Sequence, residues 1–507
     1  MNPTVEQTNA VALASTGVSM KLIAFAGAGK TSTLILIARA LGTQNKHGLY
    51  LAFNKGIASE AANKLPNNVK VSTFHSLAYR NSPAWLTAKL RMPVLSPNEF
   101  IRRFQLRPIP VTAYDFTKAG VKRVGIIKKI SGFEQMLIID KGLKVFMNSS
   151  SKAPAERHVR AAVDELFERV DFNDKNFLAS RLFVIMRNIW MDYLNPEGKI
   201  GLGNNHGVYL KYWALSEPKI NADFILFDEA QDADPIMIGV LLKQVCPVIY
   251  VGDAHQQIYG WLGAVNVMQK LDVPVRHLTQ SFRFGDNLAQ YAQPILDYLG
   301  ESNQFKGLKA PGVTQIDETN TKPKDLSVVL CRTNMGALEV MMEYASSGLF
   351  ALPKNLDLKH TISMLEAIRA FEQNPASQKN HSVLKGFKDF QELTKYNEEF
   401  YGDQAISPYL KIYNEYEYRD IQNMLARCSN QSKQDNWAFE VTTAHRSKGL
   451  EWDNVMLHSD FNDQFFNKDK SPKDANDEEY RLLYVAITRA RKKLYSANVT
   501  KIIKMLH

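Results

Sequence analysis

Short, unbroken apolar runs separated by amphipathic stretches dominate the amino-terminal end of the chain. Apolar residues fill most of 21–26 and 48–53, helix-type spacing follows these two runs, to about residue 40 and over 56–65, and a third strand signal lies at 69–74. Apolar runs without alternation are typical of strands covered on both faces, as in parallel sheets. This end of the chain is therefore predicted to form a doubly wound α/β sheet.

The same strand pattern returns after a long interval. Residues 85–215 have helix-type spacing and many basic residues, whereas 223–227 and 248–251 are again short apolar runs. A parallel sheet interrupted by a mainly helical insertion explains this order. The polar stretch 301–325, which contains glycine and proline, is expected to be a surface connection.

A second α/β domain is expected in the carboxyl-terminal half. The run 327–331 indicates a further strand, and residues 480–499 have the pattern of a helix followed by a strand. We therefore expect this second domain to span about 280–507.

The composition is that of an ordinary globular protein. Of the 507 residues, 45% are hydrophobic and 22% are charged, and a chain of this length is expected to form about three domains. Cys246, Cys331 and Cys428 lie far apart without a CxxC pair, which favours neither a disulfide framework nor a zinc cluster. We also expect no membrane span and no obvious secretion signal, because no apolar stretch reaches about 18 residues.

Positive charge is concentrated in one segment. The formal net charge is +10, and residues 101–160 hold 13 Lys/Arg against four Asp/Glu. Basic residues interleaved with aromatic ones are typical of a surface that faces a polyanion, although a solvated helix face is the alternative for any single basic residue. The cluster comprises Arg102, Arg103, Lys118, Lys122, Arg123, Lys128 and Lys129, with Phe104, Tyr114, Phe116 and Phe133.

A glycine-rich loop follows the first predicted strand. Residues 24–31 read Ala-Phe-Ala-Gly-Ala-Gly-Lys-Thr. Gly27 and Gly29 allow backbone N–H groups to face phosphate oxygens at a helix amino terminus. Lys30 would add positive charge for the β- and γ-phosphates, and the hydroxyl of Thr31 suits Mg²⁺. The string predicts a nucleoside-triphosphate site, although alanine stands where the first glycine is usual.

An acidic pair ends another predicted strand. The apolar run 225–227 is followed directly by Asp228 and Glu229. At the carboxyl end of a parallel strand, Asp228 would reach Mg²⁺ beside the phosphates. Glu229 could orient and deprotonate the attacking water. Together with the glycine loop, this pair predicts ATP hydrolysis.

Further strings follow in a fixed order. They are Phe-His-Ser at 74–76, Val-Gly-Asp-Ala-His-Gln-Gln-Ile-Tyr at 251–259, Leu-Thr-Gln-Ser-Phe-Arg at 278–283, Thr-Ala-His-Arg-Ser-Lys-Gly-Leu-Glu-Trp at 443–452, and a helix-type string at 478–490 that ends Tyr-Val-Ala-Ile-Thr-Arg-Ala. In order and spacing the set resembles the motifs of the UvrD/Rep/PcrA helicases of superfamily 1. Residues 24–27, 51–55 and 280–285 are similar to the helicase portion of the F-box DNA helicases. Since these motifs begin at residue 7, we expect no F-box in this chain.

The resemblance implies a nucleotide site assembled from several motifs. Gln7 would read adenine through its amide and Phe282 would stack on the ring. Arg283 and Arg489 would reach the γ-phosphate from across a domain cleft, where such a residue typically contributes about 10³–10⁵ in rate. The implied catalytic residues are Lys30, Asp228, Glu229, Gln256, Arg283 and Arg489. The implied ATP-binding residues are Gln7, Ala26, Gly27, Ala28, Gly29, Lys30, Thr31, Ser32, Phe282 and Glu451, with Thr31 and Asp228 as ligands of Mg²⁺.

The resemblance also implies a path for single-stranded DNA. Aromatic and imidazole side chains at strand ends can stack on any base, with roughly 1–3 kcal/mol for each stacked base, so a motor can move past them without regard to sequence. The implied DNA-binding residues are Phe53, Asn54, His75, Tyr259, Trp261 and His445.

Three positions depart from the pattern of the family. Ser32 and Leu262 stand where arginines are usual, and His255 replaces an acidic residue. We therefore expect adenine contacts and the coupling of ATP to DNA to differ from those of the relatives.

The resemblance implies a domain order as well as a fold class. We expect an α/β protein with two RecA-like P-loop NTPase domains and a mainly helical insertion. A RecA-like ATP-binding domain 1A would comprise 1–90 and 215–279, and a helical, basic domain 1B would comprise 91–214. Domain 2A would span 280–507 with a reduced insertion around 355–435, so that a fourth, 2B-type domain is small or absent.

These observations predict an ATP-dependent DNA helicase and single-stranded DNA translocase, with 3′→5′ polarity taken from the resemblance alone. It would act in DNA repair, recombination or replication on single-stranded and tailed double-stranded DNA. We expect it to be a monomer and not to bind membranes. We expect it in the cytoplasm, associated with the nucleoid, if the source is a prokaryote or phage, and in the nucleus if the source is a eukaryote. The alternatives are an RNA-directed motor, a remodeler that strips proteins from DNA without unwinding, and a regulatory module that binds ATP without hydrolysing it.

Overall fold

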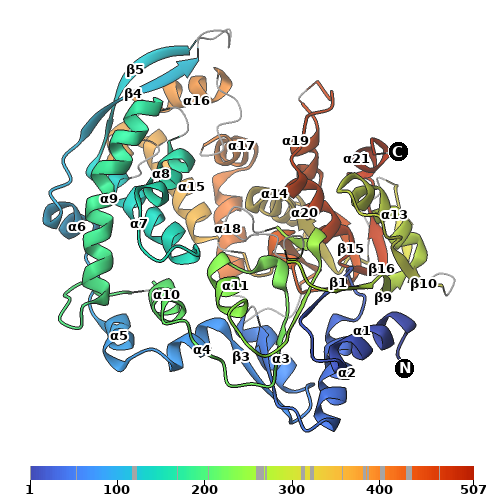
Figure 1. Ribbon diagram of the computed structural model, residues 1–507. Helices are drawn as coiled ribbons and strands as arrows, with labels where there is room; N and C mark the ends of the chain where they lie inside the picture. Colours follow the sequence, from blue (N-terminus) through green and yellow to red (C-terminus); the bar gives the residue numbers. More distant parts are fainter. Residues whose placement is uncertain are drawn as a thin grey trace. The chain divides into compact units, whose positions relative to one another are not determined.

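Contacts within the computed structural model divide the chain into two units, which we describe separately (Figure 1). The first unit comprises Met1–Ala24 and Lys30–Leu278, and the second comprises Phe25–Gly29 and Thr279–His507. The structure describes residues 2–52, 54–116, 123–167, 170–203, 205–258, 268, 271–309, 314–319, 325–356, 358–380, 384, 387–399, 406–429, 437–467 and 469–506.

The first unit is built on a six-stranded parallel sheet in the order β3-β2-β6-β7-β1-β8. All residues of β2, β6 and β7 are buried, because helices cover both faces of a doubly wound sheet. The predicted parallel sheet is confirmed. The strands are β1 Met20–Ala24, β2 Gly48–Ala52, β3 Val69–Thr73, β6 Phe224–Phe227, β7 Val248–Gly252 and β8 Val275–Leu278.

Local signals in the sequence set the helix starts of this sheet domain. Thr4 and Gln7 form a reciprocal capping box at the start of α1, and the hydroxyl of Thr73 caps α4. The helices are α1 Val5–Ser15, α2 Lys30–Thr43, α3 Lys55–Ala62, α4 Phe74–Arg80 and α11 Pro235–Leu241.

The insertion after α4 contains six α-helices in its described part and a β-hairpin that the sequence analysis missed. β4 (Ile109–Phe116) and β5 (Arg123–Ile130) pair antiparallel from Ile109 opposite Ile130 to Phe116 opposite Arg123 (Figure 1). The helix-like pattern expected for about 85–215 does not hold for these two strands. Ile109, Val111 and Ala113 are buried on one face of the hairpin, which is the alternation of a half-buried strand. The helices are α5 Ala84–Ala88, α6 Pro97–Arg103, α7 Gly132–Asn148, α8 Glu156–Leu166, α9 Phe172–Leu194 and α10 Gly207–Leu215.

The second unit contains another six-stranded parallel sheet, in the order β11-β16-β15-β12-β14-β13. A separate pair of parallel strands, β9 and β10, precedes it in the chain. Part of the polar stretch 301–325 forms β10 and β11, so the expectation of a surface connection is wrong for those residues. The strands are β9 Gln280–Gly285, β10 Lys306–Leu308, β11 Gln315–Asp317, β12 Val328–Cys331, β13 Ala351–Pro353, β14 Phe439–Thr443, β15 Trp452–Leu457 and β16 Ala490–Tyr495.

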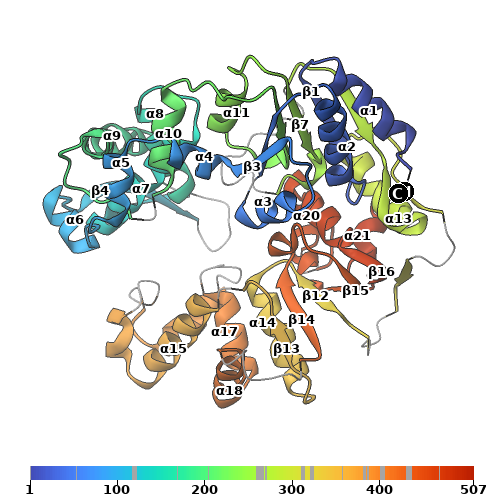
Figure 2. The ribbon, with the colours of Figure 1, turned by 90° about the horizontal axis from the view of Figure 1, so that it is seen from below.

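The helices of the second unit fall into two groups. One group packs on the sheet, where α14 lies against β12, β13 and β14 (Figure 2). The other group, between β13 and β14, has an apolar cluster of its own that includes Met364, Phe371, Leu393 and Leu410. Among the described residues, no helix combines the length and hydropathy that a membrane span requires. The helices are α13 Asp286–Tyr298, α14 Asn334–Ala345, α15 Lys359–Gln373, α16 Phe390–Glu399, α17 Ser407–Glu415, α18 Tyr418–Ser429, α19 Asn462–Phe465, α20 Asp477–Ile487 and α21 Thr500–Lys504.

Candidate functional site

Strand order brings three of the predicted motifs to one edge of the first sheet. β6, β7 and β1 are neighbours in that sheet and run parallel. Their carboxyl ends lead into Asp228 and Glu229, into Asp253, and into the glycine loop. Open α/β sheets bind ligands at this edge, outside the carboxyl ends of the strands.

Lys30 and Glu229 form an ion pair at this edge. Lys30 Nζ lies 2.7 Å from Glu229 Oε1. Burial lowers the pKa of Lys30, but the carboxylates of Glu229, Asp228 and Asp253 outweigh burial and the net pKa is raised. Lys30 is therefore a permanent cation at neutral pH. Glu229 has a left-handed backbone with φ of 53°, a conformation that is uncommon outside glycine and that gathers at functional sites.

Asp228 is held by a tyrosine that the sequence analysis missed. The hydroxyl of Tyr50, on β2, donates a 2.6 Å hydrogen bond to Asp228 Oδ2, and the backbone N–H of Glu229 donates to Oδ1 at 2.9 Å. Burial and the charge of Glu229 raise the pKa of Asp228, while Lys30 and the Tyr50 hydroxyl oppose the rise. The carboxylate is thus oriented from both of its oxygens.

Gln256 and Gln231 connect the third motif to the acidic pair. Gln256 Nε2 donates to Asp253 Oδ2 at 2.7 Å. Gln231 Nε2 donates to Glu229 Oε2 at 2.6 Å, and its Oε1 accepts from the N–H of Asp253 at 3.1 Å. Gln231 was not predicted, and its place three residues after Asp228 was the available signal. The result is one hydrogen-bonded network beside Lys30.

The predicted adenine reader and the first residues of α2 lie in the same unit. Gln7 is buried; its Nε2 donates to Thr33 Oγ1 at 3.1 Å and its Oε1 accepts from the N–H of Thr4 at 3.0 Å. Both ends of its amide are therefore engaged. Thr31 is half-buried at the start of α2, and Ser32 is exposed.

The glycine loop divides between the units. Phe25, Ala26, Gly27, Ala28 and Gly29 group with the second unit, whereas Lys30 begins α2 of the first. Gly27 and Gly29 have φ of 72° and 77°, which glycine adopts without steric cost.

In the second unit, the two predicted arginines both bond to the segment around Glu451: Arg283 to Glu451 itself and Arg489 to the neighbouring Leu450. Arg283 Nε lies 2.6 Å from Glu451 Oε2, and Arg283 Nη1 donates to the carbonyl of Thr488 at 3.0 Å. Arg489 is buried and donates to the carbonyls of Val485 and Leu450. The ion pair of Arg283 with Glu451 was not predicted. Phe282 is half-buried on β9.

The structure describes three of the six predicted DNA-binding residues, Asn54, His75 and His445. Phe53, Tyr259 and Trp261 lie outside the described residues, as does Leu262. Asn54 caps α3, with Oδ1 accepting from the N–H of Ile57 at 2.9 Å.

Both predicted histidines are neutral at pH 7. His75, on α4, lies 3.3 Å from the hydroxyl of Tyr209, and burial together with His206 lowers its pKa. At the end of β14, burial and the nearby Arg332 lower the pKa of His445 to about 4. Any contact of these rings with DNA would therefore rely on stacking or hydrogen bonding rather than on charge.

An ion pair of an arginine with a glutamate lies near His445. Arg332 makes a bidentate ion pair with Glu479, with nitrogen–oxygen distances of 2.6 and 2.7 Å. Asp460 accepts from the N–H groups of Arg332 and Thr333, each at 2.9 Å. The backbone that carries this arginine is thereby fixed at the start of α14.

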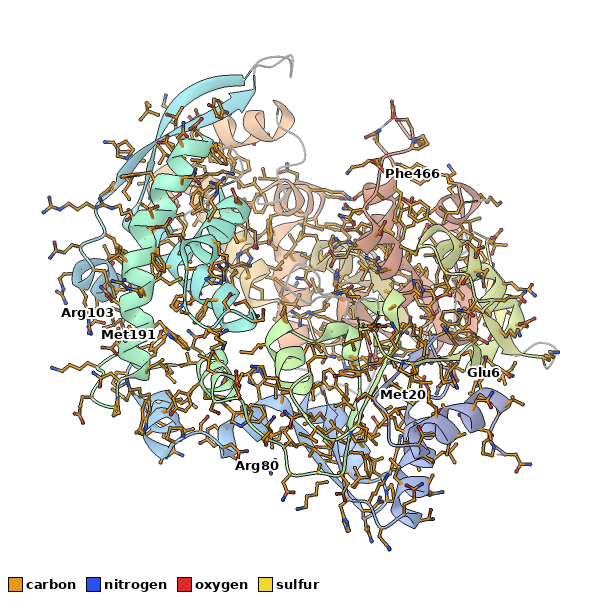
Figure 3. The ribbon with its side chains drawn as sticks, viewed as in Figure 1. Glu6, Met20, Arg80, Arg103, Met191 and Phe466 are labelled. Carbon is orange, nitrogen blue, oxygen red and sulfur yellow. The ribbon has the colours of Figure 1, made fainter. Side chains whose placement is uncertain are left out.

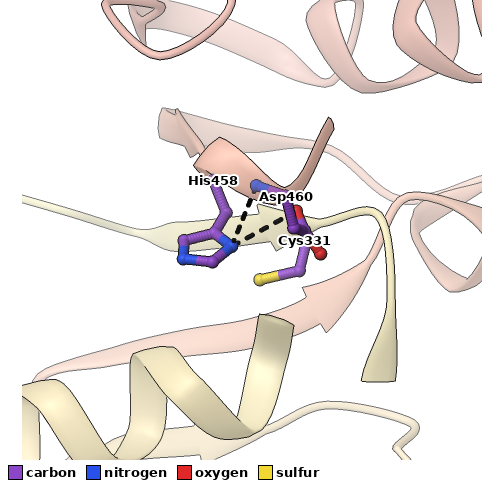
Figure 4. A group of neighbouring side chains, drawn as sticks. All are labelled: Cys331, His458 and Asp460. Carbon is purple, nitrogen blue, oxygen red and sulfur yellow. Dashed lines mark hydrogen bonds and ion pairs between the residues drawn. The ribbon is translucent and has the colours of Figure 1, made fainter. Parts of the chain in front are cut away.

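Asp460 also belongs to a group of possible metal ligands. Atoms of Cys331, His458 and Asp460 lie within 4.8 Å of one another (Figure 4). His458 Nδ1 is 3.2 Å from Asp460 Oδ1. The two carboxylate oxygens of Asp460 also accept the backbone N–H groups of Arg332 and Thr333. Burial raises the pKa of the Cys331 thiol well above its usual range. These features suit a structural cap of α14 better than a metal centre.

The basic segment places its lysines in different surroundings. Lys128 and Lys129 are both exposed, but Lys128 lies 3.4 Å from Glu134 and over the ring of Phe167, whereas Lys129 is on the opposite face of β5. Lys118 and Lys122 lie outside the described residues. Arg103 lies beside the carboxyl-terminal part of α9, near Met191, and is 3.8 Å from Asp192 (Figure 3).

Comparisons with known proteins agree with the motifs. A family model described as an AAA domain matches residues 7–261, and one described as a UvrD-like helicase C-terminal domain matches residues 314–500. The chain is 29% identical over 513 residues to F-box DNA helicase 1 of Gallus gallus, with 94% of this chain and 47% of that protein covered. It is also 29% identical over 519 residues to F-box DNA helicase protein 1 of Schizosaccharomyces pombe, with 94% and 55% covered. The chain thus spans about half the length of these relatives.

Among solved structures, the complex of Arterivirus nonstructural protein 10 (helicase) with DNA matches 96% of this chain and 62% of its own, at 11% identity and a TM-score of 0.32. This likeness is too low to bear on the fold.

Two parallel-sheet domains, with a glycine loop and an acidic pair at the carboxyl ends of β1 and β6 on either side of β7, define a P-loop NTPase. The chain belongs to the UvrD-like helicases of superfamily 1, and its similarity to the F-box DNA helicases extends over nearly its whole length. The predicted family and fold class are confirmed.

Proposed function

We propose that this chain hydrolyses ATP with Mg²⁺ and uses the energy to move 3′→5′ along single-stranded DNA and to separate duplex strands. The network at the edge of the first sheet carries the proposal: Lys30 is paired with Glu229, beside the oriented carboxylate of Asp228. Family membership supports the helicase class, whereas the polarity comes from the resemblance alone.

The network suits phosphoryl transfer. An incoming triphosphate offers Lys30 a stronger partner than Glu229, so that Glu229 would be released to orient and deprotonate the attacking water. Gln231 holds the second oxygen of Glu229 and limits where this carboxylate can move. Gln256, anchored on Asp253, would sense the γ-phosphate.

Mg²⁺ fits the oxygen donors of this edge. Asp228 and the hydroxyl of Thr31 would hold it, since carboxylate and hydroxyl oxygens are ligands that Mg²⁺ prefers. When bound, the metal neutralises charge on the phosphates. The Tyr50 hydroxyl and the Glu229 N–H keep the Asp228 carboxylate in one orientation for this purpose. Arg283 and Arg489 would add positive charge at the γ-phosphate, as the resemblance implies.

The nucleic acid is proposed to be DNA. The curated relatives are named as DNA helicases, and the exposed Lys129 and the other basic residues of 101–160 suit a phosphate backbone. We place the protein at the nucleoid or in the nucleus, according to its source, where it would act in repair, recombination or replication.

Tailed duplexes test the proposal. We expect ATP-dependent separation of a duplex with a 3′ single-stranded tail, and little separation with a 5′ tail. Lys30→Ala should abolish separation, whereas Lys64→Ala, which changes an exposed lysine paired with Glu60, should not. Preference for the 5′ tail would refute the polarity. Removal of a bound protein without strand separation would favour the remodeler, and stronger stimulation by RNA would favour the RNA-directed motor.

A further inference from the structure

An apolar anchor lies inside the glycine loop. Phe25 is buried, and its ring meets the edge of Phe305 with centroids 5.0 Å apart. Phe305 also packs against Phe284 at 5.6 Å and against Tyr484 at 6.1 Å. All four rings are buried within the second unit, so Phe25 ties the loop to an aromatic cluster.

Backbone hydrogen bonds hold the next two residues of the loop. The N–H of Ala26 donates to the hydroxyl of Tyr484 at 3.1 Å, and the N–H of Phe282 donates to the carbonyl of Gly27 at 2.8 Å. Ala26 is fully buried, so its N–H has no water to replace the tyrosine.

The loop also fits closely against β9. A Cβ atom built on Gly27 would lie 2.4 Å from Ser281 Oγ and 2.7 Å from Arg283 Cβ. Together with its positive φ, this space admits only glycine at position 27. Three successive residues of the loop, Phe25, Ala26 and Gly27, are therefore held by contacts within the second unit.

We propose that Phe25 and Tyr484 are positioning residues of the ATP site, which hold the glycine loop in its phosphate-binding shape from the second unit. The inference rests on the proposed nucleotide site and deepens it. A loop that is ordered before the ligand arrives binds more tightly, because the ordering entropy is not charged to binding. Tyr484 lies on α20, five residues before Arg489, which follows two residues after the end of that helix, so one short segment supports the loop and carries a predicted catalytic arginine.

Tyr484→Phe tests the polar half of the anchor, because it keeps the ring and removes only the hydroxyl. The N–H of Ala26 is then buried without its partner, a loss that corresponds to at least about fivefold in affinity. We expect a fluorescent ADP analogue with Mg²⁺ to bind five- to tenfold more weakly, and KM for ATP to rise similarly while kcat changes less than about threefold. Hydrogen exchange in the peptide that covers 20–31 should become faster.

Tyr480→Phe is the matched control, since Tyr480 is buried one turn earlier on α20 and stacks on Tyr298 instead. It should leave nucleotide affinity unchanged. If Tyr484→Phe does not fold, Phe25→Leu provides the second variant, with the same expected loss of affinity.

The outcomes separate the two proposals. Equal nucleotide affinity in wild type, Tyr484→Phe and Tyr480→Phe would overturn the anchor even if ATP turnover is normal. Wild-type protein that binds the ADP analogue but never hydrolyses ATP would overturn the motor, while the ratio of affinities would still decide the anchor. Wild-type protein that binds no nucleotide would overturn both.

Discussion

Tyr50→Phe should remove the side-chain hydrogen bond that orients the Asp228 carboxylate. The hydroxyl is buried and donates a 2.6 Å hydrogen bond to a carboxylate, and hydrogen bonds to charged groups contribute roughly 1.5–3 kcal/mol. We therefore expect the free energy of unfolding to fall by about 2 kcal/mol. Because this hydroxyl holds the pKa of Asp228 down, its removal should raise that pKa further.

The same change should weaken the use of Mg²⁺. Residues that orient a metal ligand typically contribute about 10–100-fold to metal affinity or activity, so the Mg²⁺ concentration for half-maximal ATPase should rise by about tenfold or more. The measurement is a Mg²⁺ titration of ATPase activity at fixed ATP, together with urea unfolding of the same protein.

Tyr250→Phe is the matched control. Tyr250 is buried on β7, which lies on the other side of β6 from β2, and its hydroxyl bonds to no carboxylate among the residues that the structure describes. It should leave the Mg²⁺ dependence unchanged. If Tyr50→Phe behaves like Tyr250→Phe in both assays, the proposed orientation of Asp228 is refuted.

Three other changes test separate parts of the molecule. Glu479→Ala removes one side of the bidentate pair with Arg332 and should lower stability by about 2 kcal/mol; an unchanged thermal midpoint would contradict this. His158 has its pKa lowered to about 4, mainly by burial, and its Nδ1 accepts from the N–H of Ala155. As pH falls, His158 therefore takes up a proton at higher pH in the unfolded chain than in the folded one, and up to about 3 kcal/mol of stability should be lost between pH 6.5 and 4. Urea unfolding at each pH measures this loss, and His158→Gln should remove it. Lys129→Glu should weaken binding of single-stranded DNA and reduce the salt dependence of that binding. If the variant and the wild type bind with equal affinity at both low and high salt, Lys129 does not contact a phosphate.

Strand pattern was sufficient to predict how the main motifs converge. Apolar runs that end in polar residues predict buried parallel strands, and parallel strands place their carboxyl ends at one edge. For this reason Lys30, Asp228 and Glu229 could be expected to lie together, and the structure brings them together. Position along the chain carries this information because the sheet imposes a direction.

Side-chain partners were not predictable in the same way. Tyr50 occupies the middle of a wholly buried strand, where its apolar neighbours indicate core packing, and only the neighbouring strand β6 brings Asp228 to its hydroxyl. In the same way, basic composition could not show that Lys128 pairs with Glu134 while Lys129 lies on the opposite face of β5. Which side of a strand faces the core depends on tertiary packing, and the β4–β5 pairing that sets it was itself missed.

Steady-state ATP hydrolysis with and without single-stranded DNA tests the central claim most directly. We predict that purified protein with Mg²⁺ hydrolyses ATP slowly alone and much faster with single-stranded DNA, and that Lys30→Ala hydrolyses ATP in neither case. Turnover that DNA does not stimulate, or that persists in Lys30→Ala, would contradict the assignment of this chain as a DNA-driven ATP motor.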